Sequence, residues 1–134
     1  MTEQALGIGA ITLFVADPQR SKEFYVRAFD LRVVYEDDAA ATLKMDNLLL
    51  NLLKVSEAGE LIEPAKVGTT TDGARFQLTI WVANADQTCA RLADKGIALL
   101  NGPMDRPWGV RTAAFADPDG HVWEVAQELP GAAS

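Results

Sequence analysis

Ile11-Thr12-Leu13-Phe14-Val15-Ala16-Asp17 is repeated in the second half of the chain as Leu78-Thr79-Ile80-Trp81-Val82-Ala83-Asn84. The offset is 67 positions (78 minus 11), which is half of the 134-residue chain. Both segments are rich in β-branched and aromatic residues, as strands are, and both end at a residue type that caps helix N-termini well. Each copy is therefore predicted to be a strand that leads directly into a helix.

The last strands of the two halves also match. Asp46-Asn47-Leu48-Leu49-Leu50-Asn51-Leu52 aligns with Asp119-Gly120-His121-Val122-Trp123-Glu124-Val125, at an offset of 73 positions (124 minus 51). The second copy therefore has about six more residues between the anchors (73 minus 67), which we place at 101–108. Two matched blocks in the same order indicate an internal duplication.

Each half is predicted to fold as a βαβββ module. The helices should run from about Pro18 to Phe29, with Phe24, Tyr25 and Ala28 inward, and from about Ala85 to Lys95, with Ala85, Cys89 and Leu92 inward. The remaining strands are expected at 31–36, 39–45, 47–54, 97–100, 109–116 and 121–127. We therefore predict an α+β fold in which two tandem modules form a curved mixed sheet around a cavity.

The module boundaries are expected at about 7–55 and 75–127 within a single domain spanning 1–134. The linker at about 56–74 contains several glycines and a proline and has no clean periodicity. A connection of this length without secondary structure is uncommon, and usually forms a lid or a subunit contact.

Composition narrows the classes of function. The chain is 49% hydrophobic and 23% charged, which is typical of a packed globular protein. It has no apolar run long enough to span a membrane and no secretory signal pattern, and its lone Cys89 fits a reducing compartment, so we expect a cytoplasmic protein without a membrane partner. The net charge of −7 argues against nucleic-acid binding and favours a cationic small molecule.

Strand alternation places polar residues on one face of each predicted sheet. Asn51 and Glu124 fall at equivalent positions on that face, which they share with Thr12 and Thr79 respectively. Glu124 interrupts an apolar strand, where an ionised carboxylate is costly unless it is solvated or paired. It is therefore interpreted as a residue that faces a pocket; the alternative is an exposed glutamate at a sheet edge.

The chain resembles the vicinal oxygen chelate superfamily, which includes glyoxalases, bleomycin-resistance proteins and extradiol dioxygenases. The resemblance runs from Gly7 to Gln127. It depends on the opening 10–17 segment with Ser21 and Phe24-Tyr25, and on the closing Phe115-Ala116-Asp117-Pro118-Asp119-Gly120-His121 followed by Glu124. Because members catalyse many reactions and some only bind drugs, the resemblance specifies a fold rather than a reaction.

In metal-dependent members, four strands each supply one ligand, usually His, Gln or Glu. The resemblance places these positions at Ala10, Asn51, Gln77 and Glu124. Alanine has no donor atom and the two amides are neutral, so Glu124 is the single anionic ligand in the set. Such a set should bind catalytic ions weakly, because these ions favour imidazole, thiolate and carboxylate ligands. We therefore expect no cofactor, with a weakly bound divalent ion as the alternative.

Other side chains are candidates for contact with a ligand. Phe14, Trp81 and Trp108 are suited to be aromatic walls of a pocket, although core packing explains them equally well. Arg111 is expected either to pair with Glu124 or to bind an acidic group of a ligand.

Three further residues are expected to have structural roles. Arg106 fits a solvated surface position at least as well as a site at the pocket mouth. The single histidine, His121, is one residue out of phase with Glu124 and should point away from the pocket. Cys89 has the spacing of a buried helix residue.

These features predict a metal-free, homodimeric binding protein that encloses an apolar or cationic organic molecule, with Phe14, Asn51, Gln77, Trp81, Trp108, Arg111 and Glu124 as ligand contacts. The homodimer is implied by the resemblance alone. The alternative is a metal-dependent lyase, isomerase or dioxygenase, in which Gln77, Glu124 and Asn51 would hold the ion. In a metal-free enzyme, Glu124 would be the catalytic general base. A third interpretation is a regulatory module without a small ligand.

Overall fold

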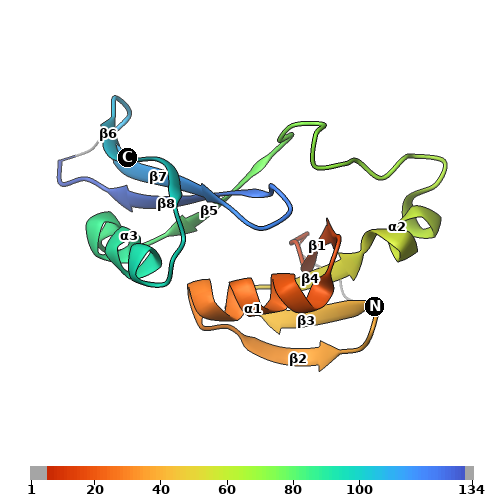
Figure 1. The fold of residues 1–134 in the computed structure, drawn as a ribbon. Helices are drawn as coiled ribbons and strands as arrows, with labels where there is room; N and C mark the ends of the chain where they lie inside the picture. The colour runs from red at the N-terminus through yellow and green to blue at the C-terminus, as the bar shows by residue number, and fades with distance from the viewer. Residues whose placement is uncertain (1–5, 132–134) are drawn as a thin grey trace. The chain divides into compact units, whose positions relative to one another are not determined.

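The computed structural model describes residues 6–131, and the chain divides after Gly68 into two compact units. Each unit contains one four-stranded mixed sheet and a helix that packs on it, so the α+β class and the two repeated modules are confirmed (Figure 1). The two modules are described separately below.

The first module consists of β1 (Ala10–Val15), α1 (Pro18–Phe29), β2 (Arg32–Glu36), β3 (Ala40–Lys44), β4 (Leu49–Lys54) and α2 (Val55–Ile62). Its strand order is β1-β4-β3-β2. The β1 and β4 strands pair in parallel, while β3 is antiparallel to both β4 and β2. The connection through α1 therefore takes the chain from one edge of the sheet to the other.

The second module repeats this arrangement with β5 (Gln77–Trp81), α3 (Ala85–Asp94), β6 (Leu99–Arg106), β7 (Val110–Ala116) and β8 (Val122–Glu128). Its strand order is β5-β8-β7-β6, with a parallel β5–β8 pair and antiparallel β8–β7 and β7–β6 pairs. The two modules therefore share the same strand order as well as the repeated sequence segments.

Side-chain caps fix the beginnings of α1 and α3. The Asp17 carboxylate accepts hydrogen bonds from the backbone N–H groups of Gln19 and Arg20, and the Asn84 side chain accepts one from that of Gln87. These bonds satisfy N–H groups that have no partner within the helix. The predicted bounds of α1 are confirmed, and α3 ends one residue earlier than predicted, at Asp94.

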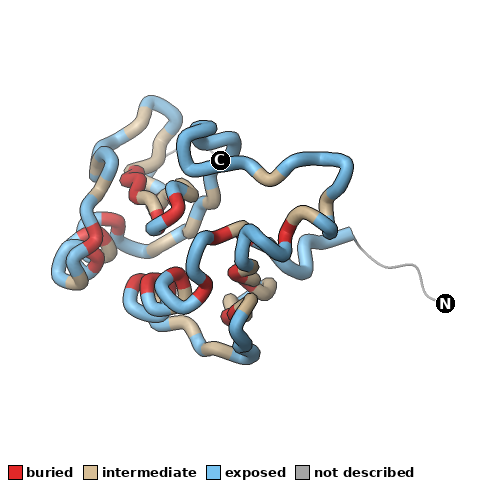
Figure 2. The backbone as a smooth tube through the Cα atoms, turned by 45° about the vertical axis from the view of Figure 1, so that its right-hand side comes forward, coloured by how far each residue is buried: buried red, intermediate tan, exposed pale blue. Residues whose placement is uncertain are grey.

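The core of each module lies between its first helix and one face of its sheet. Figure 2 shows buried positions on one side of α1 and α3 and on the strands. In the first module the buried apolar side chains include Leu13, Val15, Phe24, Tyr25, Ala28, Leu43, Leu50 and Leu52. In the second they include Ala85, Cys89, Leu92, Phe115, Trp123 and Val125. The predicted inward faces of both helices are confirmed.

Two segments differ from the sequence predictions. The linker contains the helix α2, whose buried residue is Ala58, so it is not a structureless connection. Residues 101–106, predicted to be part of an inserted loop, extend β6, which pairs with β7 through two irregularities in register. Among residues 6–131, no helix combines the length and apolar character needed to cross a membrane.

Candidate functional site

We define the open face of each sheet as the face opposite its first helix. In the first module the pairing register aligns Thr12, Asn51, Thr42 and Tyr35 across this face, one residue from each strand. The Asn51 amide oxygen accepts a hydrogen bond from the Thr42 hydroxyl (2.9 Å), and its amide nitrogen donates to the Thr12 hydroxyl (3.2 Å). Both ends of the Asn51 side chain are therefore engaged within its own sheet.

The open face of the second module carries the equivalent row Thr79, Glu124, Ala114 and Asn101. The Thr79 hydroxyl donates to Glu124 Oε1 at 2.9 Å. Ala114 occupies the position that Thr42 has in the first module, so no hydroxyl group there donates a hydrogen bond to Glu124. Within the described part of its module, Glu124 thus keeps acceptor capacity for a further donor, whereas Asn51 is held from both sides.

The four positions that resemble metal ligands occupy these open faces, but they do not form a fitting donor set. Ala10 pairs with Leu49 and supplies no donor atom, and the Asn51 oxygen already accepts from Thr42. Gln77 is exposed and supplies a neutral amide. Across residues 6–131, no cluster of three or more His, Cys, Asp and Glu side chains is arranged to hold an ion. The donor chemistry therefore does not fit the divalent ion of catalytic relatives.

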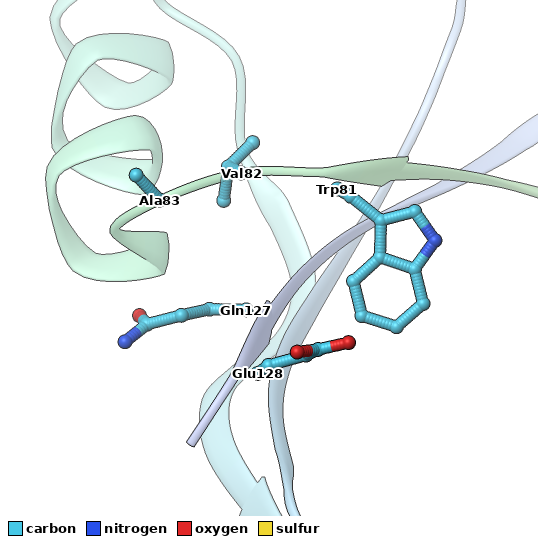
Figure 3. Close-up of a pocket in the computed structure, with 5 residues that line it drawn as sticks. All are labelled: Trp81, Val82, Ala83, Gln127 and Glu128. Carbon is cyan, nitrogen blue, oxygen red and sulfur yellow. The ribbon is translucent and has the colours of Figure 1, made fainter. Parts of the chain in front are cut away.

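A hollow of about 360 Å³ lies where β5 and β8 end, lined by Trp81, Val82, Ala83, Gln127 and Glu128 (Figure 3). The Trp81 side chain is 62% exposed, and its residue pairs with Ala126 in the sheet register. Gln127 Oε1 accepts a hydrogen bond from the Ala85 backbone N–H at 2.8 Å. The hollow therefore combines an exposed indole with a carboxylate beside the start of α3.

Arg111 lies on the helix-covered face of the second sheet rather than the open face. Its guanidinium binds Asp105 (2.6 Å) and Asp86 of α3 (2.9 Å), so the predicted pair with Glu124 is wrong. The hydrogen bond from Arg111 lowers the pKa of Asp105 from its ordinary value. Strand alternation explains the result, because Arg111 pairs with Gln127 and not with a residue in phase with Glu124.

Arg106 is the arginine on the open face. Its Nε donates to the Thr112 hydroxyl at 2.8 Å, and a terminal nitrogen lies 3.4 Å from Asn101 Oδ1. Thr112 is buried, so this bond fixes the guanidinium against the sheet. The sequence pattern did not place Arg106 on this face, because the pairing of β6 with β7 is irregular and cannot be derived from simple alternation.

The remaining candidates divide between surface and core. Phe14 is partly buried on the open face of β1, and Trp108 lies in the turn between β6 and β7 with 68% of its surface exposed. Cys89 is buried, as predicted, and burial raises the pKa of its thiol. His121 is partly buried, and its Nδ1 lies 2.8 Å from the Asp117 carboxylate.

Two tandem βαβββ modules, each with a parallel strand pair at one edge, define the fold of the vicinal oxygen chelate proteins. A model of the Glyoxalase/Bleomycin resistance protein/Dioxygenase superfamily matches residues 7–125, and the chain belongs to this superfamily. The chain is 29% identical over 123 residues to the Bacillus subtilis (strain 168) protein named Uncharacterized protein YraH, covering 89% of this chain and 96% of that protein.

Solved structures support the same fold. A glyoxalase/bleomycin resistance protein/dioxygenase from Nocardioides superposes with a TM-score of 0.83 at 24% identity, covering 97% of this chain and 88% of that one. A glyoxalase-related enzyme from Fulvimarina pelagi gives a TM-score of 0.78 at 25% identity, covering 92% and 89% of the two chains. At these identities the similarity specifies architecture rather than a reaction.

Proposed function

We propose that this protein is a metal-free binding protein of the glyoxalase and bleomycin-resistance type, which holds a small apolar or cationic organic molecule. The observation that carries the proposal is the row Thr12–Asn51–Thr42. At a position where catalytic relatives present a ligand to metal, Asn51 has both ends of its amide engaged by threonine hydroxyls. An ion at this oxygen would share a neutral acceptor with the Thr42 hydroxyl and would gain no charge attraction from it, which works against metal binding.

The chemistry of the open faces favours an organic ligand over an ion. The open face of the first module presents the aromatic ring of Phe14. That of the second module presents the Trp81 indole and, at Glu124, an acceptor of hydrogen bonds. Aromatic walls with a few polar groups are the usual lining of small-molecule sites. The overall charge of −7 raises the local concentration of cations and disfavours anionic substrates.

Metal content tests the first part of the proposal. Protein purified without added ions should contain far less than one transition-metal ion per chain by mass spectrometry, and titration with Mn²⁺, Zn²⁺, Ni²⁺ and Fe²⁺ should show only weak binding. The Glu124→Gln variant should behave like the wild type, with Glu60→Gln on the exposed face of α2 as a charge-matched control. Near one ion per chain, lost in Glu124→Gln alone, would instead favour the metal-dependent enzyme.

Ligand binding tests the second part. In a thermal-shift screen of apolar and cationic aromatic compounds against matched anionic compounds, members of the first set should raise the melting temperature. A ligand at about 100 times its Kd stabilises the folded state by about 2.7 kcal/mol, which such a screen detects readily. No shift across the whole panel would contradict the proposal and favour a module without a small ligand.

A further inference from the structure

We infer that the hollow at the ends of β5 and β8 is a binding site for a compact organic cation, such as a methylated ammonium group, held between the Trp81 indole and the Glu128 carboxylate. This inference rests on the proposed binding function and specifies its ligand chemistry. The hollow is lined by none of the four positions that correspond to metal ligands in the superfamily. Glu128 is not among the ligand contacts predicted from the sequence.

The sheet register brings the two side chains to one face. Trp81 pairs with Ala126, and Glu128 lies two residues further along β8, so all three side chains project to the open face. Figure 3 shows the Glu128 carboxylate extending toward the six-membered ring of Trp81.

A ring face and a carboxylate are the two groups that recognise an alkylated ammonium ion. The ring quadrupole attracts a cation over its face, and tryptophan is the strongest of the aromatic side chains in this respect. The carboxylate adds charge attraction without requiring an N–H donor, which a quaternary ammonium lacks. Val82, Ala83 and Gln127 also line the hollow.

The start of α3, next to the hollow, would favour an anion if its N–H groups were free. They are largely engaged: the Ala85 N–H donates to Gln127 Oε1, and the Gln87 N–H donates to Asn84. Asp86, in the first helical turn, is paired with Arg111, so that pair adds little net charge. The engaged N–H groups therefore offer little to an anion, and the Glu128 carboxylate favours a cation.

The size of the hollow limits the ligand. A volume of about 360 Å³ is near the lower end of the range for small-molecule sites. Since Trp81 remains 62% exposed, the bound group keeps contact with solvent. The site should therefore hold the cationic head of a ligand with modest affinity, roughly micromolar to millimolar, while the rest of the molecule lies outside the hollow.

The test uses choline and its neutral isostere 3,3-dimethylbutan-1-ol, which replaces the ammonium nitrogen with carbon. Titration of the ¹⁵N-labelled full chain should shift the Trp81 indole N–H and the backbone amides of residues 81–83 and 127–128 with choline. The isostere should bind at least about tenfold more weakly, which corresponds to about 1.4 kcal/mol. Raising the salt concentration should weaken choline binding and leave the isostere unaffected.

Two variants assign the contacts. Trp81→Leu should weaken choline binding about tenfold, and Glu128→Gln about threefold to fivefold with loss of the salt dependence. Glu60→Gln makes the same change in net charge at an exposed position of the first module, and Phe76→Leu removes an exposed aromatic ring outside the hollow. Both controls should bind choline as the wild type does. Unchanged melting temperatures confirm that the variants are folded.

The outcomes separate this inference from the proposed function. Equal binding of choline and its isostere, or full affinity in both Trp81→Leu and Glu128→Gln, would overturn the cation site. If compounds from the thermal-shift screen still bind with full affinity to both variants, the binding function stands and only its assignment to this hollow fails. If neither choline nor any screened compound binds, both proposals fail.

Discussion

At the scale of single residues, the two modules show how one position acquires different chemistry. Asn51 and Glu124 occupy equivalent places, and each is bonded to the threonine of the adjacent parallel strand, Thr12 or Thr79. The next strand supplies Thr42 in one module and Ala114 in the other. Because of that single difference, the Asn51 side chain is bonded to threonines on both sides of it, whereas Glu124 is bonded to a threonine on one side.

His121 provides a prediction at this scale. Its Nδ1 lies 2.8 Å from Asp117 Oδ2, and the Asp117 side chain is fully buried. Burial of the imidazole lowers the pKa of His121, but the hydrogen bond to Asp117 and the charges of Asp117 and Asp119 outweigh it, so the pKa is raised above its ordinary value of 6.5. The folded protein therefore binds this proton more tightly than the unfolded chain does.

The consequence is a pH-dependent stability. The contribution of His121 should be complete below pH 6.5 and should be lost as the pH rises through the higher pKa of the folded state. Urea unfolding between pH 5 and 9 should show the wild type losing free energy of unfolding over this window relative to His121→Gln. Parallel pH profiles for the two proteins would contradict the prediction.

The sequence correctly predicted the face of the sheet on which a strand side chain lies, because this depends only on the alternation of side chains along the strand. The pattern placed Asn51 with Thr12 and Glu124 with Thr79 on one face of each sheet, as the pairing register has them, because side chains on a strand change face at every residue. It did not identify Glu128, because β8 was predicted to end at Gln127, nor the partners of Arg111. A long side chain reaches charges on other elements, here Asp86 of α3, and strand alternation carries no information about them.

At the scale of elements, Gly102 fixes the approach of β6 to β7. It has a φ of 83°, and a Cβ atom there would lie 2.4 Å from the carbonyl oxygen of Thr112 and 2.8 Å from Ala113 Cα. Both are backbone atoms of β7, which cannot move aside cheaply. Gly102→Ala should therefore destabilise the protein by about 2–4 kcal/mol, measured as the free energy of unfolding in urea.

Gly59→Ala is the matched control for this prediction. Gly59 lies in α2, and a methyl group added there would have no neighbouring atom within 4 Å, so alanine should leave the stability unchanged or raise it by up to about 1 kcal/mol. A loss at Gly102→Ala no greater than that at Gly59→Ala would show that β6 and β7 separate easily.

Helices and strands whose ends are marked by capping residues could be predicted from the sequence, and those that contain an internal glycine or proline could not. α1 begins at Pro18 after the capping Asp17, and this pair marks its start in the sequence. No side-chain hydrogen bond caps the start of α2. The helix contains Gly59 and is followed by Pro64, so its sequence has the composition of a loop. Strand β6 contains Gly102 and Pro103, residues that normally break strands, and it persists through irregular pairing with β7.

At the scale of the whole molecule, the homodimer implied by the family resemblance is a prediction that the assembly state can test. Strands β1, β2, β5 and β6 lie at the edges of their sheets, where backbone groups are available for pairing. Large exposed apolar side chains among residues 6–131 include Leu61, Phe76, Leu100 and Trp108. A symmetric dimer is the commonest small assembly, and it would bury some of these side chains between two copies of the chain.

Sedimentation equilibrium tests this expectation, since a homodimer should have about twice the 14.5 kDa mass of the chain. Because assembly stabilises the folded state by mass action, the melting temperature of a dimer should also rise with protein concentration.

A homodimer would have two cation sites per particle. Choline titrations should therefore saturate at one equivalent per chain at protein concentrations above and below the point where the dimer dissociates. A mass of one chain at all concentrations, with a constant melting temperature, would contradict the homodimer.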